Sequence, residues 1–549
     1  GAGRRPAALR WVPAASGLAA AAAGLALAAV VAFLVAGVRS GPVDWAELVT
    51  SSTWDPAGGR FGATAMVWGT AAVAGVALLL AAPVGWAAAV AIVELAPPRW
   101  RRALRGGAEL LAVVPSIVYG LVGLAYLRPL VSTLAGVPGG DSLLAAGLVL
   151  AVMILPTIVA VSADALARVP PAWREAAAAC GLTRSEVVRR AVLPAARRGL
   201  GAAALLALAR ALGETIAVYL VVGRADGRFP SGLGDVAERL VRPGQTLTTK
   251  LNGPESVLAG TAGAHWAALC ALGVLLLASV VVLTVVGQRR SGEGPPAPAR
   301  TRRARSPLRT AARGRAARDR AGRAVAAGGL AVVLGLVVAV GVAVLARAGA
   351  ALDAGFWLGR SAGASGGGIR DQLAGTLLLV GAAGVLAAPV GLGMGLVVAE
   401  YAGRRTARWL RALALTLGGI PSILLGLWGY WLFATRLGWG KSWLAGSIVL
   451  AVLAVPPVVV AVSAALAALP AERREAALGL GLRRSQLVRS VLVPQALPGL
   501  VTGLLLGLAR AAGETAPLLF TATVFSGAPT LPTGVTASPV VALPTHIFT

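Results

Sequence analysis

Residues 174–194 read REAAAACGLTRSEVVRRAVLP, and residues 474–494 read REAALGLGLRRSQLVRSVLVP. Both stretches open on Arg-Glu-Ala-Ala, carry a glycine six positions after the glutamate and close on a proline. Each predicts a compact knob: a short Ala-rich helix ended by the glycine, a second helical piece, and a proline before the next helix. A lone stretch of this kind is typical of a basic amphipathic helix at a membrane surface. Its recurrence 300 positions later indicates a repeated unit.

The repeat extends on both sides of these stretches. Gly213-Glu214-Thr215 recurs as Gly513-Glu514-Thr515, and Pro115-Ser116-Ile117 recurs as Pro421-Ser422-Ile423. Ala-rich segments resemble one another by chance, but Pro, Gly and polar positions in one order do not. The sequence therefore predicts two homologous copies in one chain. We divide it into a first domain at residues 1–288, a basic linker at residues 289–323 and a second domain at residues 324–549.

Composition excludes a single soluble globule. The chain has 549 residues, of which 57% are hydrophobic and 13% charged, with a formal net charge of +28. An average soluble domain is about 25% charged. The arginines form short clusters between long apolar runs, which is typical of membrane loops and not of a nucleic-acid-binding face. Cys180 and Cys270 are too few and too far apart for a disulfide framework or a zinc site.

Eleven apolar runs are long enough to cross a membrane. About 20 apolar residues are needed for a helix to span the hydrocarbon, because lipid offers no partner to a bare backbone group. The first copy holds six runs and the second holds five, so we expect a twelfth span to be missing from this chain. The runs are residues 17–37, 65–93, 110–127, 143–163, 200–222, 264–286, 327–345, 377–398, 415–433, 444–464 and 500–520.

Charge asymmetry orients these spans. With the N-terminus in the cytoplasm, the inner loops hold most of the 50 Lys and Arg residues, as the positive-inside rule requires. The same charge favours contact with anionic lipid. Both copies then begin inside and form parallel repeats of a multi-pass protein of the plasma membrane. The linker falls inside as well, and its Arg, Pro, Gly and Ala content predicts disorder.

One Arg-Glu pair lies inside the fifth run of each copy. Arg210 and Glu214 are four positions apart, as are Arg510 and Glu514, so each pair is expected on one helix face. A lipid-exposed ion would cost a few kcal/mol or more, so the pairs should face the protein interior. One alternative is a buried pair that fixes helix packing. The other is a path for an oxyanion. The two Arg guanidinium groups would bind the anion, and the two Glu carboxylates would help to release it.

Neighbouring hydroxyls are further candidates for this path. Thr215 and Thr515 could donate to an anion, although a threonine bonds its own helix as readily. Ser116 and Ser422 follow helix-disrupting prolines and could line the path or serve packing alone.

Carboxylates and histidines elsewhere carry weaker signals. Glu94 and Glu400 end the second spans near the inside. The first expectation there is a carboxylate that reaches to the membrane interface, and the second is a contact with the knob. His265 and His546 are isolated, so no metal site is expected.

The repeated stretch closely resembles the EAA loop of ABC importer permeases, which forms the coupling helix that docks on an ATP-binding subunit. The resemblance implies two cytoplasmic ATP-binding subunits that use ATP and Mg, while this chain binds no cofactor and is not itself an enzyme. It also implies an extracytoplasmic binding protein that delivers the substrate. The implied docking residues are Glu175, Ala176, Ala177, Gly181, Glu475, Ala476, Ala477 and Gly481.

Further motifs resemble the phosphate-specific (Pst) permeases. LARALGETIAV from Leu208 and LARAAGETAPLL from Leu508 resemble their fifth span, and TLTTKL at residues 246–251 resembles the PstC type in particular. The resemblance implies an all-α type I permease with a PstC-like first half and a PstA-like second half that together import phosphate. The alternatives are another oxyanion, sulfate or molybdate, and an ion-coupled secondary transporter, which would leave the EAA loops without a purpose. A phosphate-signalling regulator is compatible as a further partner.

Overall fold

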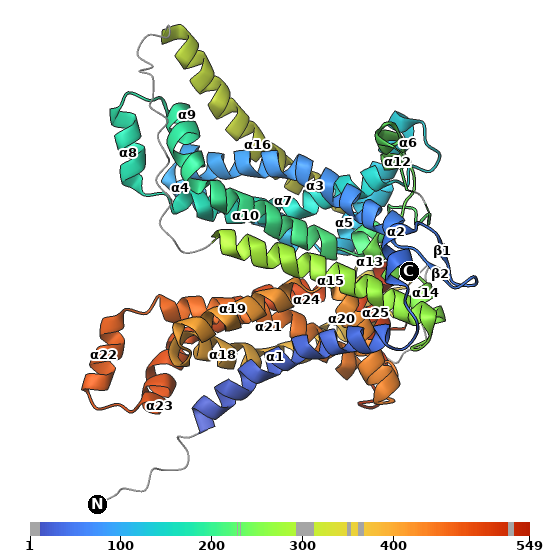
Figure 1. The fold of residues 1–549 in the computed structure, drawn as a ribbon. Helices are drawn as coiled ribbons and strands as arrows, with labels where there is room; N and C mark the ends of the chain where they lie inside the picture. Colours follow the sequence, from blue (N-terminus) through green and yellow to red (C-terminus); the bar gives the residue numbers. More distant parts are fainter. Residues whose placement is uncertain are drawn as a thin grey trace, which may run out of the picture. The chain divides into compact units, whose positions relative to one another are not determined.

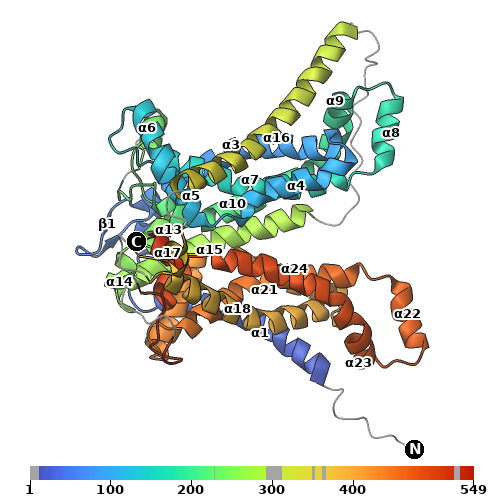
Figure 2. The same cartoon turned by 180° about the vertical axis from the view of Figure 1, so that it is seen from behind.

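The computed structural model describes residues 11–227, 229–230, 232–291, 312–348, 353–360, 367–524 and 532–548. These residues are mostly helical, and their one small sheet is a two-stranded antiparallel hairpin (Figures 1 and 2). Ten helices are long and apolar enough to cross a membrane. A bent pair, Arg404–Gly419 with Ser422–Arg436, brings the number to eleven. The predicted all-α multi-pass fold is therefore confirmed, and the candidate spans number up to eleven, as many as the predicted runs.

The chain divides into two compact units, which we describe separately. The N-unit comprises Ala46–Lys250 and Ala278–Gly349, and the C-unit comprises Gly1–Trp45, Leu251–Leu277 and Ala350–Thr549. Helix α15 (Ala264–Ser291) belongs partly to each.

The N-unit contains two strands, which pair Trp54 with Phe61, and most helices of the first copy. Its elements are α2 (Trp45–Thr50), β1 (Trp54–Asp55), β2 (Arg60–Phe61), α3 (Thr64–Val90), η2 (Ala91–Leu95), α4 (Pro98–Val113), α5 (Ser116–Val122), η3 (Gly123–Leu127), α6 (Arg128–Ala135), α7 (Leu143–Ala167), α8 (Pro171–Ala179), α9 (Arg184–Val187), η4 (Val188–Val192), α10 (Leu193–Gly213), α11 (Ile216–Tyr219), η5 (Leu233–Asp235), α12 (Val236–Leu240), α13 (Leu247–Leu251) and α16 (Ala312–Ala348).

The C-unit contains most helices of the second copy. Its elements are α1 (Trp11–Val38), α14 (Glu255–Leu258), α17 (Ala354–Leu358), α18 (Arg370–Leu396), η6 (Val397–Tyr401), α19 (Arg404–Gly419), α20 (Ser422–Gly429), η7 (Tyr430–Arg436), α21 (Trp443–Ala467), α22 (Ala471–Gly479), α23 (Arg484–Leu487), η8 (Val488–Leu492), α24 (Val493–Ala512), α25 (Ala516–Thr521) and α26 (Leu543–Phe548).

The first helix of each copy packs in the unit formed by the other copy. Helix α16 packs against α3 and α4, and α1 packs against α18 and α19. Val333 and Val340 of α16 are buried in the N-unit core. The predicted division at residues 1–288 and 324–549 therefore follows the repeat but not the compact units. Hydropathy identifies an apolar helix without identifying the helices it packs against.

The third spans are interrupted at the Pro-Ser motif. Helix α4 ends before Val114, whose ψ of 126° is extended, and α5 begins after Pro115. Ile420 has a ψ of 129° before Pro421, and the helices on either side of it bend by 85°. A proline disfavours the helical conformation of the residue before it, so the predicted runs 110–127 and 415–433 are each two helices and not one.

The fifth spans also break, at the Gly-Glu-Thr motif. Helix α10 ends at Gly213, and Glu214 is extended with ψ 131° before α11 begins at Ile216. In the second copy α24 ends at Ala512 and α25 begins at Ala516. The expectation that Arg210 and Glu214 share one helix face is therefore wrong, because Glu214 lies beyond the end of the helix.

The predicted disordered linker is partly helical. Helix α15 continues to Ser291, and α16 begins at Ala312, so the two ends of the range 289–323 belong to helices. Residues 292–311 lie outside the described part. The helical start of α16 is rich in Ala and Arg, both strong helix formers, and Asp319 pairs with Arg323 four positions later.

Candidate functional site

The first knob, residues 171–192, is a helical hairpin built around Gly181. Helix α8 ends at Ala179, and Gly181 has a φ of +75°, which disfavours any residue with a Cβ. No atom lies within 4 Å of a Cβ built there, so backbone conformation and not space requires the glycine. Thr183 and Glu186 then form a reciprocal capping box that starts α9.

The second knob, residues 471–492, repeats this turn with a weaker cap. Gly481 has a φ of +81°. Arg483 replaces the capping threonine, and Gln486 accepts a hydrogen bond from the Arg483 backbone N–H at 2.9 Å. A guanidinium cannot accept a hydrogen bond, so the second knob lacks half of the capping box.

The predicted docking residues of each knob differ in exposure. Glu175 and Ala176 are exposed, as are Glu475 and Ala476, while Ala177 is half-buried and Ala477 buried. Among the described residues neither the Glu175 nor the Glu475 carboxylate has a hydrogen-bond or ion-pair partner. Two solvent-facing carboxylates at matching places are thus available to a partner protein.

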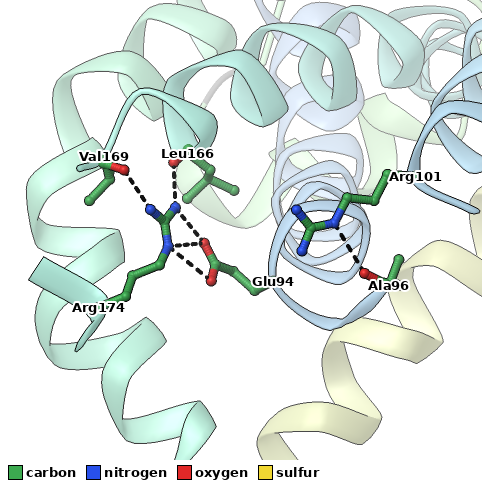
Figure 3. Close-up of polar contacts among 6 residues, drawn as sticks. All are labelled: Glu94, Ala96, Arg101, Leu166, Val169 and Arg174. Atoms are coloured by element: carbon green, nitrogen blue, oxygen red, sulfur yellow. Dashed lines mark hydrogen bonds and ion pairs between the residues drawn. The ribbon is translucent and has the colours of Figure 1, made fainter. Parts of the chain in front are cut away.

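The residue before each docking glutamate fastens the knob to the second span. Arg174 Nε and Nη2 donate to the Glu94 carboxylate at 3.0 and 2.8 Å, in a forked arrangement (Figure 3). The same guanidinium donates to the backbone carbonyls of Leu166, at 2.8 Å, and Val169. Beside them Arg101 Nε donates to the carbonyl of Ala96 at 3.1 Å. Arg174 thus joins α8 to the end of α7 and to η2.

The second copy repeats this connection with fewer hydrogen bonds from the guanidinium. Arg474 Nη2 lies 2.8 Å from Glu400 Oε1 and donates to the carbonyl of Leu466 at 2.7 Å. The ion pair is close, yet within the described residues Arg474 Nε has no hydrogen-bond partner. For Glu94 and Glu400 the knob contact, the second of the two expectations, is therefore confirmed. Arg174 and Arg474 were missed, although their place before Glu-Ala-Ala in both copies was a visible signal.

The arginines of the fifth spans are exposed. Arg210 and Arg510 both lie in the last turn of their helices, where the helix dipole favours a cation. Arg510 Nε lies 3.7 Å from Glu514 Oε1, too far for a hydrogen bond, and its side chain is 42% exposed.

The predicted hydroxyls differ in their surroundings. Thr215 and Thr515 are each 1% exposed. Thr215 Oγ1 makes a long contact of 3.4 Å with its own segment at Gly213 O, whereas Thr515 Oγ1 has no hydrogen-bond partner in the described part of the chain. Ser116 and Ser422 are half-buried at the first residue of α5 and α20.

Each unit brings its Pro-Ser and Gly-Glu-Thr segments together. A Cβ on Gly120 of α5 would lie 3.1 Å from Ala217 Cα of α11, and a Cβ on Gly426 of α20 would lie 2.8 Å from Pro517 Cα of α25. Such close backbone contact is available only to glycine. The helices that follow the two motifs therefore pack directly on each other within each copy.

The TLTTKL segment forms a buried polar cluster that was not predicted as a site. The backbone N–H of Leu247 donates to Thr70 Oγ1, and the N–H of Leu543 donates to Thr376 Oγ1, both at 2.9 Å. Helices α13 and α26 thus take equivalent places in the two copies. Only α13 carries a lysine, Lys250, which is 2% exposed.

Comparison with known proteins agrees with this geometry. A family model described as "Binding-protein-dependent transport system inner membrane component" matches residues 81–292 and 391–533. The chain is 42% identical over 193 residues to the "Probable ABC transporter permease protein YqgH" of Bacillus subtilis, covering 35% of this chain and 61% of that protein. It is 33% identical over 261 residues to the "Phosphate transport system permease protein PstC" of Mesorhizobium japonicum, covering 44% and 77%.

The second type of Pst permease is matched as well. The chain is 41% identical over 186 residues to the "Phosphate transport system permease protein PstA 2" of Mycobacterium tuberculosis, covering 34% of this chain and 61% of that protein. The chain thus spans about three fifths of the length of several of these relatives.

Proposed function

Because the chain belongs to the family of binding-protein-dependent transport system inner membrane components, we propose that it is the fused permease of an ATP-driven importer of inorganic phosphate. The observation that carries the proposal is the twofold presence of one knob, each with an exposed docking glutamate and an Arg–Glu pair behind it. The names of relatives of both the PstC and PstA types support phosphate as the substrate.

The proposed partners follow from the two knobs. Two cytoplasmic ATP-binding subunits would dock on α8 and α22, and an extracytoplasmic protein would deliver phosphate on the other side of the membrane. The chain would lie in the plasma membrane with its N-terminus in the cytoplasm, as the distribution of positive charge indicates. ATP hydrolysis would take place in the partner subunits.

The Arg–Glu pairs would transmit movement of the knobs to the spans. A docked ATPase that shifts α8 also pulls on Glu94, because Arg174 grips its carboxylate with two nitrogens. Glu94 lies in η2, which continues α3, and α3 packs against α7 and α10. The C-unit offers the same connection from Arg474 through Glu400 to α18 and from there to α21 and α24. Alternating access would follow from this coupling.

Phosphate would meet the exposed arginines at the ends of α10 and α24. A guanidinium presents its donors in a fork that matches two oxygens of phosphate. Glu514, near Arg510, would offset part of this attraction and speed release. The buried hydroxyls of Thr215 and Thr515 and the half-buried hydroxyls of Ser116 and Ser422 are proposed to line the same path.

Reconstitution tests the proposal. The chain, its ATPase and its binding protein are placed in proteoliposomes, and uptake of labelled phosphate is measured with and without ATP and with excess sulfate or molybdate. We expect uptake that needs ATP and resists both competitors. Inhibition by either competitor would reassign the substrate, and uptake driven by an ion gradient without the ATPase would refute the proposal.

A further inference from the structure

The polar extension of α16, residues 312–323, lies against the first knob. Figures 1 and 2 both show this end of α16 beside α9, and the two helices are in contact. Asp319 Oδ1 accepts hydrogen bonds from the backbone N–H and the hydroxyl of Ser185, both at 2.9 Å. Arg315 Nη2 donates to the carbonyl of Gly181 at 2.7 Å and pairs with Glu186 at 3.0 Å. A segment expected to be a disordered linker thus makes four polar contacts with the knob.

These contacts satisfy backbone groups that the knob cannot satisfy alone. The first amides of a helix have no acceptor within the helix, so those at the start of α9 need acceptors from elsewhere. Thr183 supplies an acceptor for Glu186, and Asp319 supplies one for Ser185. A carboxylate is favoured there because it faces the positive end of the helix. The Ser185 N–H correspondingly holds the pKa of Asp319 below its ordinary value.

Close packing accompanies the hydrogen bonds. A Cβ built on Gly322 would lie 2.8 Å from Ser185 Cβ, so the two backbones approach closely. The Asp319 side chain is 14% exposed and that of Glu186 15%, which shields both from solvent screening.

The second knob has no such support in the described part of the chain. Arg483 stands at the position of Thr183, and no carboxylate among the described residues accepts a hydrogen bond from the backbone of α23. The two knobs, alike in their glycine turns, therefore differ in what holds them.

We propose that residues 312–323 form a brace that fixes the first knob and so holds α8 in place for its partner, whereas the described contacts of the second knob are its own turn and the Arg474–Glu400 pair. The brace and the first knob belong to the same compact unit. That the partner is an ATPase rests on the function proposed above; the brace itself does not.

Hydrogen exchange tests the brace without any transport assay. The full chain in nanodiscs, without partner subunits, should exchange amides 182–190 more slowly than amides 482–490. Asp319→Ala should speed exchange at residues 182–190 by at least about tenfold, because a charged hydrogen bond to a backbone amide is lost. Asp319→Asn should restore protection, since its amide oxygen still accepts, and Arg318→Ala, an exposed neighbour, should change nothing. Equal exchange of the two wild-type knobs, or no effect of Asp319→Ala, would overturn the proposal.

Cross-linking tests whether brace and knob move together. Ser185→Cys with Gly322→Cys, in a Cys180→Ser background, places two thiols within reach of oxidation after a small shift. We expect a cross-link to form and the oxidised protein to retain ATP-dependent uptake at the level of the reduced protein. Failure to cross-link, or loss of uptake on oxidation alone, would contradict a brace that stays engaged. If the reduced protein takes up no phosphate, it is the proposed function that fails and not the brace. The exchange experiment tests the brace without any transport.

Discussion

Arg174 Nη2 lies 2.8 Å from Glu94 Oε1, across 80 positions of sequence, and so joins the knob to the inner end of the second span. The side chains are 23% and 11% exposed. Arg474 and Glu400 repeat the distance of 2.8 Å in the second copy. An exposed knob that receives force needs such a connection, because four to nine helical residues at a surface would otherwise fray.

Removal of the Arg474 guanidinium should uncouple the second knob from the spans of the second copy. Arg474→Ala leaves Glu400 half-enclosed without its cation, at a cost of about 2 kcal/mol. ATP-dependent phosphate uptake in proteoliposomes should fall at least about tenfold, while the ATPase subunits still copurify. Arg473→Ala is the matched control, since Arg473 is the exposed neighbour and has no side-chain partner within the described residues. Equal losses in both variants would assign the effect to surface charge and not to the pair.

The glycine turn should be intolerant of any side chain. Gly481→Ala forces a Cβ into a φ of +81° and should destabilise the second knob by about 1 kcal/mol. Hydrogen exchange of residues 476–490 should rise about fivefold. Gly479→Ala, two positions earlier at the end of α22, introduces the same methyl group into open space at a helical position. It should leave exchange unchanged or slow it, and a rise as large as that of Gly481→Ala would show that the turn conformation is not the cause.

Sequence patterns predicted the spans and the repeat because both depend on local apolar length and on matching polar positions. The helix breaks at Val114 and Glu214 were missed, because the mean hydropathy of a segment does not reveal a single extended residue within an apolar run. The proline after Val114 was a usable signal, and so was Gly213 directly before Glu214, since glycine often ends a helix.

Contacts distant in sequence were the harder part of the site. The contact of Glu94 with the knob was only the second of two expectations. The neighbouring sequence does not distinguish a carboxylate bound by lysine or arginine from one that faces water. The packing of α16 on α3 was not predicted, since any span offers an apolar surface to any other. Asp319 lay in a range judged disordered by its composition, although its spacing to Arg323 is helical.

The stability of the N-unit should depend on the ion pair between the buried Lys250 of α13 and Asp226. Lys250 Nζ is 2.8 Å from Asp226 Oδ2 and 4.9 Å from the ring centroid of Trp54, so one ammonium ties α13 to the loop at Asp226 and to β1. Asp226→Asn leaves the ammonium buried without a carboxylate and should destabilise the N-unit by about 2 kcal/mol. Lys250→Met should cost less, because it removes the charge that needs a partner. Thermal unfolding in detergent measures both.

A surface pair on the same side of the N-unit supplies the control for this prediction. Glu238 and Arg242 are four positions apart, with side chains 58% and 49% exposed, and Glu238→Gln should cost less than about 0.5 kcal/mol. If Lys250→Met proved more damaging than Asp226→Asn, the lysine would have a role beyond its pairing with Asp226.

The exposed arginines should be needed for uptake and not for assembly. Arg210→Ala with Arg510→Ala removes both guanidinium forks from the proposed path, and phosphate uptake should fall below about 1% of wild type. Both side chains are exposed at helix ends, so their loss should leave thermal stability and ATPase binding nearly unchanged. Arg210→Lys with Arg510→Lys keeps the charge but not the fork, and should retain part of the uptake with a raised KM. Normal uptake by the alanine double variant would end the assignment of these residues to the path, whereas loss of ATPase binding would show that they support the fold.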